Sequence, residues 1–231
     1  MEGNTLLRSY QYRYDDLGIG IHVIKNKIKN QREALNTFRN KPAAVKKAIA
    51  QLDAHIEKLE LGNPELTEIL GIEGSSARIY FAQMFDEADW KGRKPRIKND
   101  YINSTLDIAY MQIFHLVDAI LGIYGFDTYY GVLHKCFYMR KSLVCDLIEP
   151  LRPIVDLCIR KAIHLGQCKE EDFEIINHRY LLEWGKNPEY IAFIMKAILD
   201  RKDDIFLYLQ GYYRSFMKQK KPSEFPVFEI R

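Results

Sequence analysis

The segment GFDTYYGVLHKCFYMRKSLVCDLIEPLRPIVD, residues 125–156, gives the first indication of the fold and of a candidate site. Its first half is rich in glycine and tyrosine and contains one histidine, His134. Its second half is apolar and begins at Ser142, a residue type that favours the N-cap of a helix. The pattern predicts a loop that carries His134, followed by a helix from about residue 143 to about residue 165.

Charged side chains interrupt the apolar half of this segment. Asp146 and Glu149 are three residues apart, so on one helix they share a face, and Arg152 and Asp156 continue along it. Carboxylates are costly to bury without a compensating cation. That cation is either a metal ion or Arg152, which could form a ladder of salt bridges with Glu149 and Asp156. Spacing alone leaves both alternatives open.

The composition around this segment is that of a globular protein, with 231 residues, 47% hydrophobic, 28% charged and a net charge of +3. Such a length suffices for one large or two small domains. No apolar run reaches the roughly 18 residues that span a bilayer, and the first residues do not resemble a secretory signal, so no membrane is expected. The four cysteines form no CxxC pair, which favours reduced thiols and a cytosolic (cytoplasmic) location.

Helical periodicity covers most of the chain and predicts an all-α fold. Apolar residues at helical spacing predict a helix after Asp15 with a basic opposite face, a second helix from Pro42, and a long helix over residues 99–124. A short helix is expected to end at the glycine of LGIEG. Glu73 would then stand just before the next helix, where a carboxylate is often only a partner of the helix dipole.

We expect three segments along the chain. Residues 1–14 form a short N-terminal segment that is strand-like at most, because Tyr and Arg alternate there. Residues 15–221 form one α-helical domain, and residues 222–231 form a C-terminal tail. Strand signals are few, and the sequence contains no Asn-Gly or Asp-Gly hairpin turn.

Positive charge is concentrated in two places. Eight Lys or Arg residues and a single acid, Glu33, lie between Lys25 and Lys47, and further cations fill the loop at residues 86–98. Such runs form either a solvated face or a contact surface for a polyanion such as DNA. From the clustering we predict that five residues contact the DNA backbone: Lys25, Lys29, Arg93, Arg96 and Lys98.

Several catalytic motifs are absent from the sequence, which has no phosphate-binding loop, no dinucleotide fingerprint, no nucleophile elbow and no repeated E-x-x-H. Nucleotide-loop and serine-hydrolase chemistry therefore have no support. What remains is a site of carboxylates and one histidine, which suits Mg²⁺ or Mn²⁺ and phosphodiester chemistry.

Five ordered blocks within residues 20–165 resemble the CRISPR-associated endonuclease/integrase of spacer acquisition, the Cas-one family. The blocks are KNKIKNQREAL (Lys25–Leu35), GIEGSSARIYF (Gly71–Phe81), NDYINSTLDIAY (Asn99–Tyr110), GFDTYYGVLHK (Gly125–Lys135) and SLVCDLIEPLRPIVD (Ser142–Asp156). The match rests on all five blocks in this order, because no single block would be sufficient. The resemblance implies a multi-helix catalytic domain of the CRISPR adaptation integrase type.

Position by position, the resemblance implies that Glu73, His134 and Glu149 are ligands of Mg²⁺ or Mn²⁺. Asp146 would be a nearby catalytic acid, either behind the ligands or as an alternative ligand. Four residues are expected to line the site or balance its charge: Arg78, Asn103, Tyr110 and Arg152. Arg152 and Asp156 are expected to form a supporting ion pair.

The sequence departs from the family pattern in three respects. The spacing from His134 to Asp146 is one residue longer, Asp107 stands where Asn is common, and the N-terminal β-rich domain that usually makes the homodimer is missing.

The resemblance implies a metal-dependent DNA integrase/endonuclease that joins a 3′-OH of spacer DNA to the repeat array by transesterification. The partners implied are double-stranded DNA, further copies of the chain in a homo-oligomer, and the Cas-two scaffold protein. The alternative is a non-catalytic DNA-binding or assembly module of the adaptation complex.

Overall fold

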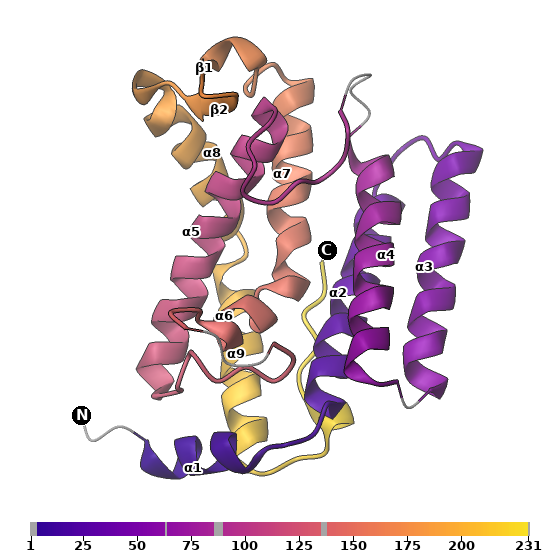
Figure 1. Cartoon of the computed structure of the whole chain (residues 1–231), viewed down its shortest axis with the longest axis vertical. Helices are drawn as coiled ribbons and strands as arrows, with labels where there is room; N and C mark the ends of the chain where they lie inside the picture. The colour runs from indigo at the N-terminus through magenta and orange to yellow at the C-terminus, as the bar shows by residue number, and fades with distance from the viewer. Residues whose placement is uncertain (1–3, 63, 86–89, 135–137, 231) are drawn as a thin grey trace.

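The computed structural model describes residues 4–62, 64–85, 90–134 and 138–230, and its fold is mostly helical (Figure 1). The α-helices are α1 Thr5–Arg13, α2 Gly18–Asn36, α3 Ala43–Leu61, α4 Leu66–Met84, α5 Tyr101–Tyr124, α6 Ser142–Leu147, α7 Arg152–His164, α8 Asn187–Leu199 and α9 Lys202–Met217. The 3₁₀ turns are η1 Glu149–Leu151, η2 Glu170–Asp172, η3 Trp184–Lys186 and η4 Pro222–Glu224. Two strands, β1 Phe173–Ile176 and β2 Arg179–Leu182, form an antiparallel hairpin. The predicted all-α class is confirmed.

The long helices form two groups that lie side by side (Figure 1). Helices α2, α3 and α4 pack on one another in the first group, and in the second α5 packs against α6, α7, α8 and α9, while η1 contacts α6 and α7. Helix α2 joins the groups, because it also contacts η1, α6 and α7. The junction between the two groups runs along α2.

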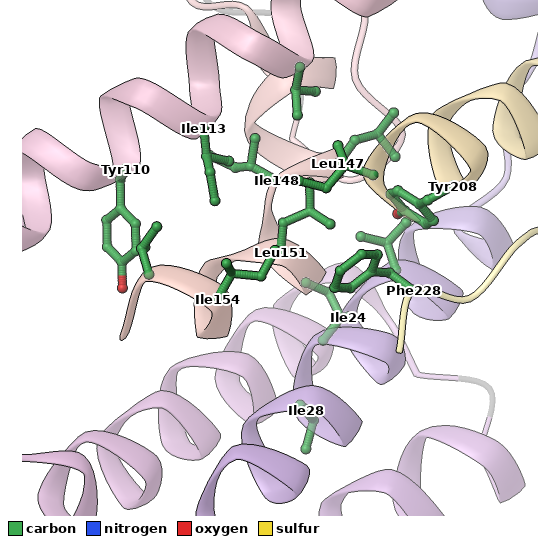
Figure 2. Packing of buried hydrophobic residues seen from close by; sticks show 14 of the residues in the cluster. Ile24, Ile28, Tyr110, Ile113, Leu147, Ile148, Leu151, Ile154, Tyr208 and Phe228 are labelled. Atoms are coloured by element: carbon green, nitrogen blue, oxygen red, sulfur yellow. The ribbon is translucent and has the colours of Figure 1, made fainter. Parts of the chain in front are cut away.

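The hydrophobic core fills this junction. Figure 2 shows Ile24 and Ile28 of α2 facing a cluster that includes Leu151 of η1, Ile113 of α5 and Phe228 of the C-terminal segment. All five side chains are at most 2% exposed. Burying one such side chain fully is worth about 1.5–3 kcal/mol. Helix α2 is therefore a central helix, and side chains on most of its circumference are enclosed.

The C-terminal segment covers a further side of α2. Asn26 donates from Nδ2 to the carbonyl of Phe228 over 2.8 Å and accepts from its N–H over 2.9 Å, and Asn30 donates to the same carbonyl over 2.9 Å. His22 is also buried there. The side of α2 away from the apolar stripe is therefore only partly basic: Lys25 and Lys29 lie near the surface, whereas Asn26 and Asn30 hold the end of the chain.

The N-terminal segment is a helix, which corrects the strand-like expectation for residues 6–14. Helix α1 is capped by Asn4, whose side chain accepts from the N–H of Leu7 over 3.1 Å. Its two buried residues, Leu7 and Gln11, are four positions apart, which is a helical spacing. Gln11 also exchanges two hydrogen bonds with the backbone of Asp127. The alternation of Tyr and Arg therefore belongs to a helix, with Arg8 and Tyr12 exposed and Tyr10 packed against the core.

Helix α4 runs without interruption through LGIEG, so the expected helix end before Glu73 is wrong. Gly71 and Gly74 are exposed, and a glycine inside a helix costs only about 1 kcal/mol. The buried Ile69 before these positions and Tyr80 after them anchor the helix to the core. Glu73 therefore projects from the middle of a helix, where it is not a partner of the helix dipole.

The predicted helix over residues 143–165 is divided into α6, η1 and α7. Pro150 and Pro153 lie at this division, and proline lacks the N–H that a continuous helix would need. Asp146 belongs to α6 and Glu149 to η1, so they do not share a face of one regular helix. The 3₁₀ turn directs the two carboxylates to different partners.

The β1–β2 hairpin is the element that the sequence did not predict. Its turn consists of Asn177 and His178, whose φ angles are 53° and 61°. A turn with two positive φ angles suits a tight hairpin, and Asn is tolerated there as well as Gly.

Two expectations from composition can be compared with the structure. Helix α5 is long and apolar enough to cross a membrane by length and composition, with 39% of the relevant window buried, so the expectation that no such segment exists is corrected. A single such helix is weak evidence, because core helices pass the same test, and α5 packs against α6, α7, α8 and α9. Among the described residues, Cys145, Cys158 and Cys168 form no disulfide, and Cys136 lies outside them.

Candidate metal-binding active site

Two of the three predicted metal ligands meet around a lysine. The ammonium nitrogen of Lys27 lies 2.7 Å from Oε1 of Glu73 and 2.6 Å from Oε2 of Glu149. These residues come from α2, α4 and η1, which meet at the junction of the two helix groups. The side chains are 8%, 16% and 6% exposed for Lys27, Glu73 and Glu149, so the cluster is shielded from bulk water.

Lys27 is the site residue that the sequence interpretation missed. It belongs to the basic run between Lys25 and Lys47, but it also lies three residues after Ile24 and directly before Ile28. A lysine within an apolar stripe of a helix is rarely buried unless it has a charged partner. Its position in that stripe was the signal that could have identified it.

Arg152 supplies the second cation at Glu149. Its Nη2 lies 2.8 Å from Oε1 of Glu149, and its guanidinium stacks 4.5 Å above the ring centroid of Tyr110. Burial by itself would raise the pKa of Glu149, but Arg152 and Lys27 outweigh it and lower that pKa from 4.5 to about 2. Burial by itself would lower the pKa of Lys27, but Glu149 and Glu73 outweigh it and raise that pKa. Lys27 and Glu149 are therefore both charged at neutral pH.

His134 is held by Asp146 rather than by the Lys27 cluster. Asp146 is completely buried, and its Oδ2 accepts from the N–H groups of Val132 and Leu133 over 2.8 and 3.0 Å. Its Oδ1 makes a short hydrogen bond with Nδ1 of His134. A Cβ at Gly131 would lie 2.6 Å from Asp146 Oδ2, so glycine allows the loop to wrap this closely. Nε2 of His134 is the ring nitrogen left for another partner.

The two halves of the site lie near each other. Positive charge on His134 contributes to lowering the pKa of Glu149, after the larger effects of Arg152 and Lys27. Within the described ranges, however, no three His, Cys, Asp or Glu side chains cluster closely enough to hold a metal ion as they stand. Lys27 occupies the space between the two carboxylates.

The residues present nevertheless fit a hard divalent cation. Two carboxylates and an imidazole nitrogen are suitable ligands for Mg²⁺ or Mn²⁺. Oε2 of Glu149 is buried and accepts no hydrogen bond from the described residues, so only the ammonium of Lys27 compensates it. The contact of His134 Nδ1 with Asp146 also matches the carboxylate that commonly orients a ligating imidazole.

Asp156 does not form the expected ion pair with Arg152, which pairs with Glu149 instead. It accepts hydrogen bonds from the hydroxyl groups of Tyr110 over 2.6 Å and Tyr80 over 3.0 Å. Burial raises the pKa of Asp156 to about 6, although both hydroxyl groups act in the opposite direction. Of the salt-bridge ladder that the spacing suggested, the structure therefore contains the pair of Glu149 and Arg152 but not the pair of Arg152 and Asp156.

This raised pKa predicts a dependence of stability on pH. Between pH 3.8 and about 6 the folded chain binds more protons at Asp156 than the unfolded chain, so the free energy of unfolding falls as the pH rises through that window. The loss attributable to Asp156 is at most about 3 kcal/mol. Urea unfolding from pH 4 to 7 should show this loss in the wild type relative to Asp156→Asn. The exposed Asp203→Asn control should follow the wild type, and parallel profiles of wild type and Asp156→Asn would contradict the prediction.

The other residues expected to line the site have separate positions. Arg78 is exposed on α4 and lines a pocket of about 760 Å³ together with Gly74 and the loop after residue 90. Asn103 is buried and binds that loop, accepting from the N–H of Lys94 over 2.8 Å and donating to the carbonyl of Gly92 over 3.1 Å. Tyr110 acts on the cluster through the stacked Arg152.

The five predicted DNA contacts differ in how accessible their charges are. Lys25 and Lys29 both lie near Glu60 at the surface, at 3.3 and 3.4 Å. Arg93 is turned inward, with its side chain 10% exposed and its Nη2 2.5 Å from Oδ1 of Asp107. The structure thus uses Arg93 to join the loop to α5. The remaining two are in the loop itself, where Arg96 is exposed and Lys98 half-buried.

The fold and the site together define a helical protein whose central junction holds two carboxylates, an oriented imidazole and a buried lysine. The family model for "CRISPR associated protein Cas1" matches residues 1–193. The chain therefore belongs to the Cas1 family, and the resemblance seen in the five sequence blocks is confirmed.

Two relatives are named as CRISPR-associated endonucleases. One, from Thermodesulfovibrio yellowstonii, is 30% identical over 95% of this chain and 74% of its own length. The other, from Francisella tularensis subsp. novicida, is 32% identical over 83% of this chain and 57% of its own length. The chain thus spans a part of each relative.

Three solved structures share the fold. A chain of a Cas6-RT-Cas1–Cas2 complex is similar over 99% of this chain and 27% of its own length, with a TM-score of 0.86 and 22% identity. A casposase bound to integration product matches 94% of this chain and 70% of its own, with a TM-score of 0.79 and 22% identity. A Cas1 protein from Thermotoga maritima matches 93% of this chain and 71% of its own, with a TM-score of 0.79 and 17% identity.

Proposed function

We propose that this chain is the catalytic part of a CRISPR adaptation integrase that inserts spacer DNA into a repeat array. The observation that carries the proposal is the meeting of Glu73 and Glu149 at the helix junction, beside the His134–Asp146 pair. Membership of the Cas1 family supports it, and so does the shared fold with a casposase that was solved with its integration product.

The proposed ligands of a divalent cation are Glu73, Glu149 and Nε2 of His134. When bound, Mg²⁺ or Mn²⁺ would stabilise negative charge on the phosphate and favour ionisation of the attacking 3′-OH in a transesterification. Asp146 fixes the orientation of the imidazole through Nδ1. Arg152 stays paired with Glu149, so it balances part of the carboxylate charge within the site.

DNA binding is proposed to depend on the exposed cations of α2 and of the loop before α5. Lys25, Lys29, Arg96 and Lys98 carry charge at or near the surface, and such contacts give affinity that falls as salt rises. We leave Arg93 out of this set because Asp107 and Asn103 already engage it.

A Cas2 scaffold, further copies of the chain and a cytoplasmic location are also proposals. Two solved structures with a similar fold are Cas6-RT-Cas1–Cas2 complexes. The non-catalytic assembly module remains the competing proposal.

Half-site integration tests the proposal. A labelled duplex with a free 3′-OH and a plasmid that carries a repeat are mixed with the chain, alone and with a Cas2 protein. We expect joined product with Mg²⁺ or Mn²⁺ and none after chelation with EDTA. DNA binding without joined product under every metal and partner condition would favour the assembly module instead. Product that forms equally well in EDTA would contradict a metal-dependent reaction.

A further inference from the structure

The charges in the Lys27 cluster balance without any added ion. Glu73 and Glu149 contribute two negative charges, and Lys27 and Arg152 contribute two positive charges. All of the Lys27–carboxylate contacts are shorter than 2.8 Å and lie largely out of solvent. A divalent cation added to this arrangement would leave two positive charges uncompensated in a shielded place, which is strongly unfavourable.

The two cations of the cluster differ in how firmly they are held. Arg152 is fixed by its contact with Glu149 and by stacking on Tyr110. Lys27 stacks on no aromatic ring among the described residues, and its ammonium ends a flexible four-carbon chain with rotatable donors. Its two contacts are also to the same two carboxylates that a metal would need.

We propose that the ammonium of Lys27 is a built-in competitor of the divalent metal: it holds the cation position between Glu73 and Glu149 until a metal ion displaces it. This inference rests on the proposed function. It assigns Lys27 a positioning role, because the ammonium keeps two like-charged carboxylates side by side in the metal-free chain. The cost is a lower metal affinity than the same carboxylates would otherwise have.

Metal affinity of a variant gives the first test. Mn²⁺ binding to the full chain is measured by electron paramagnetic resonance for the wild type and Lys27→Met. Removing the competing charge is expected to tighten Mn²⁺ binding roughly tenfold. Lys202→Met, at an exposed lysine on α9, is the matched control and should bind as the wild type does. Unchanged or weaker binding by a folded Lys27→Met chain overturns the proposal.

A measurement on the wild type decides the question if Lys27→Met does not fold. Acetylation of each lysine by acetic anhydride is followed by mass spectrometry with and without Mg²⁺. Lys27, only 8% exposed at its side chain, should react slowly without metal and several-fold faster at saturating metal, whereas Lys202 should not change. Equal protection of Lys27 in both conditions, at a metal concentration shown to saturate binding, overturns the displacement.

The two levels of inference fail in different ways. If Glu149→Ala binds Mn²⁺ as well as the wild type does, the proposed metal site itself is wrong. If Mn²⁺ binding requires Glu149 but ignores Lys27→Met, the metal site stands and only the competition by Lys27 is wrong.

Discussion

Replacing His134 with alanine should reduce half-site integration by about 10³-fold or more and leave DNA affinity within about twofold of the wild type. The loss is large because charge stabilisation by a metal ion at the reacting phosphate is worth several kcal/mol, and each 1.36 kcal/mol is tenfold in rate. The affinity persists because backbone contacts by Lys and Arg provide it. Product formation and DNA binding are measured on the same preparations at one salt concentration.

His115→Ala is the matched control for this experiment. His115 is exposed on α5, where its ring lies edge-on to that of Phe114 with the ring centroids 5.9 Å apart. It should integrate as the wild type does. Undiminished integration by His134→Ala would contradict the assignment of the site. A loss of DNA affinity in parallel with the loss of integration would instead indicate that the histidine binds DNA.

Glu149→Ala should lose both integration and stability. The substitution removes a proposed metal ligand, and it also leaves Arg152 and Lys27 without their shared, nearly buried carboxylate. Removing one partner of a buried ion pair costs about 3–5 kcal/mol, and we expect the lower end because Lys27 keeps Glu73. Urea unfolding at pH 7 without metal measures this loss independently of catalysis.

A surface glutamate with the same kinds of partner provides the comparison. Glu60 lies near two lysines, Lys25 and Lys29, but its side chain is 41% exposed. Exposed pairs contribute about 0–1 kcal/mol, so Glu60→Ala should change the free energy of unfolding by less than about 1 kcal/mol. If Glu149→Ala and Glu60→Ala were equally stable, Glu149 would not be the centre of a buried charge cluster.

The sequence predicted the helices whose apolar residues form one clear stripe and whose ends carry Pro or Gly. Helix α3 follows Pro42 as expected, and α5 ends at Tyr124, before Gly125, whose φ of 85° is that of a left-handed C-cap. These elements are determined by local chemistry. The candidate site residues came mainly from the order of the five motifs, and their roles are still predictions.

The features that the sequence interpretation missed depend on contacts between distant residues. The apolar stripe of α2 sets Lys27 apart from Lys25 and Lys29, but its partners do not follow from the local sequence, because Glu73 and Glu149 lie 46 and 122 positions further along the chain. Likewise, the charged residues from Asp146 to Asp156 have the spacing of one regular helix, so the sequence did not predict the break at η1.

The two groups of helices give the site a role in holding the molecule together. Lys27 and Glu73 belong to the group of α2, α3 and α4, whereas Glu149 and His134 belong to the other. A ligand bound to both Glu73 and Glu149 would cross-link the two groups of helices, and by mass action it would oppose their separation. Occupancy of the site would then be readable as protection of the junction from amide hydrogen exchange, without any chemical turnover.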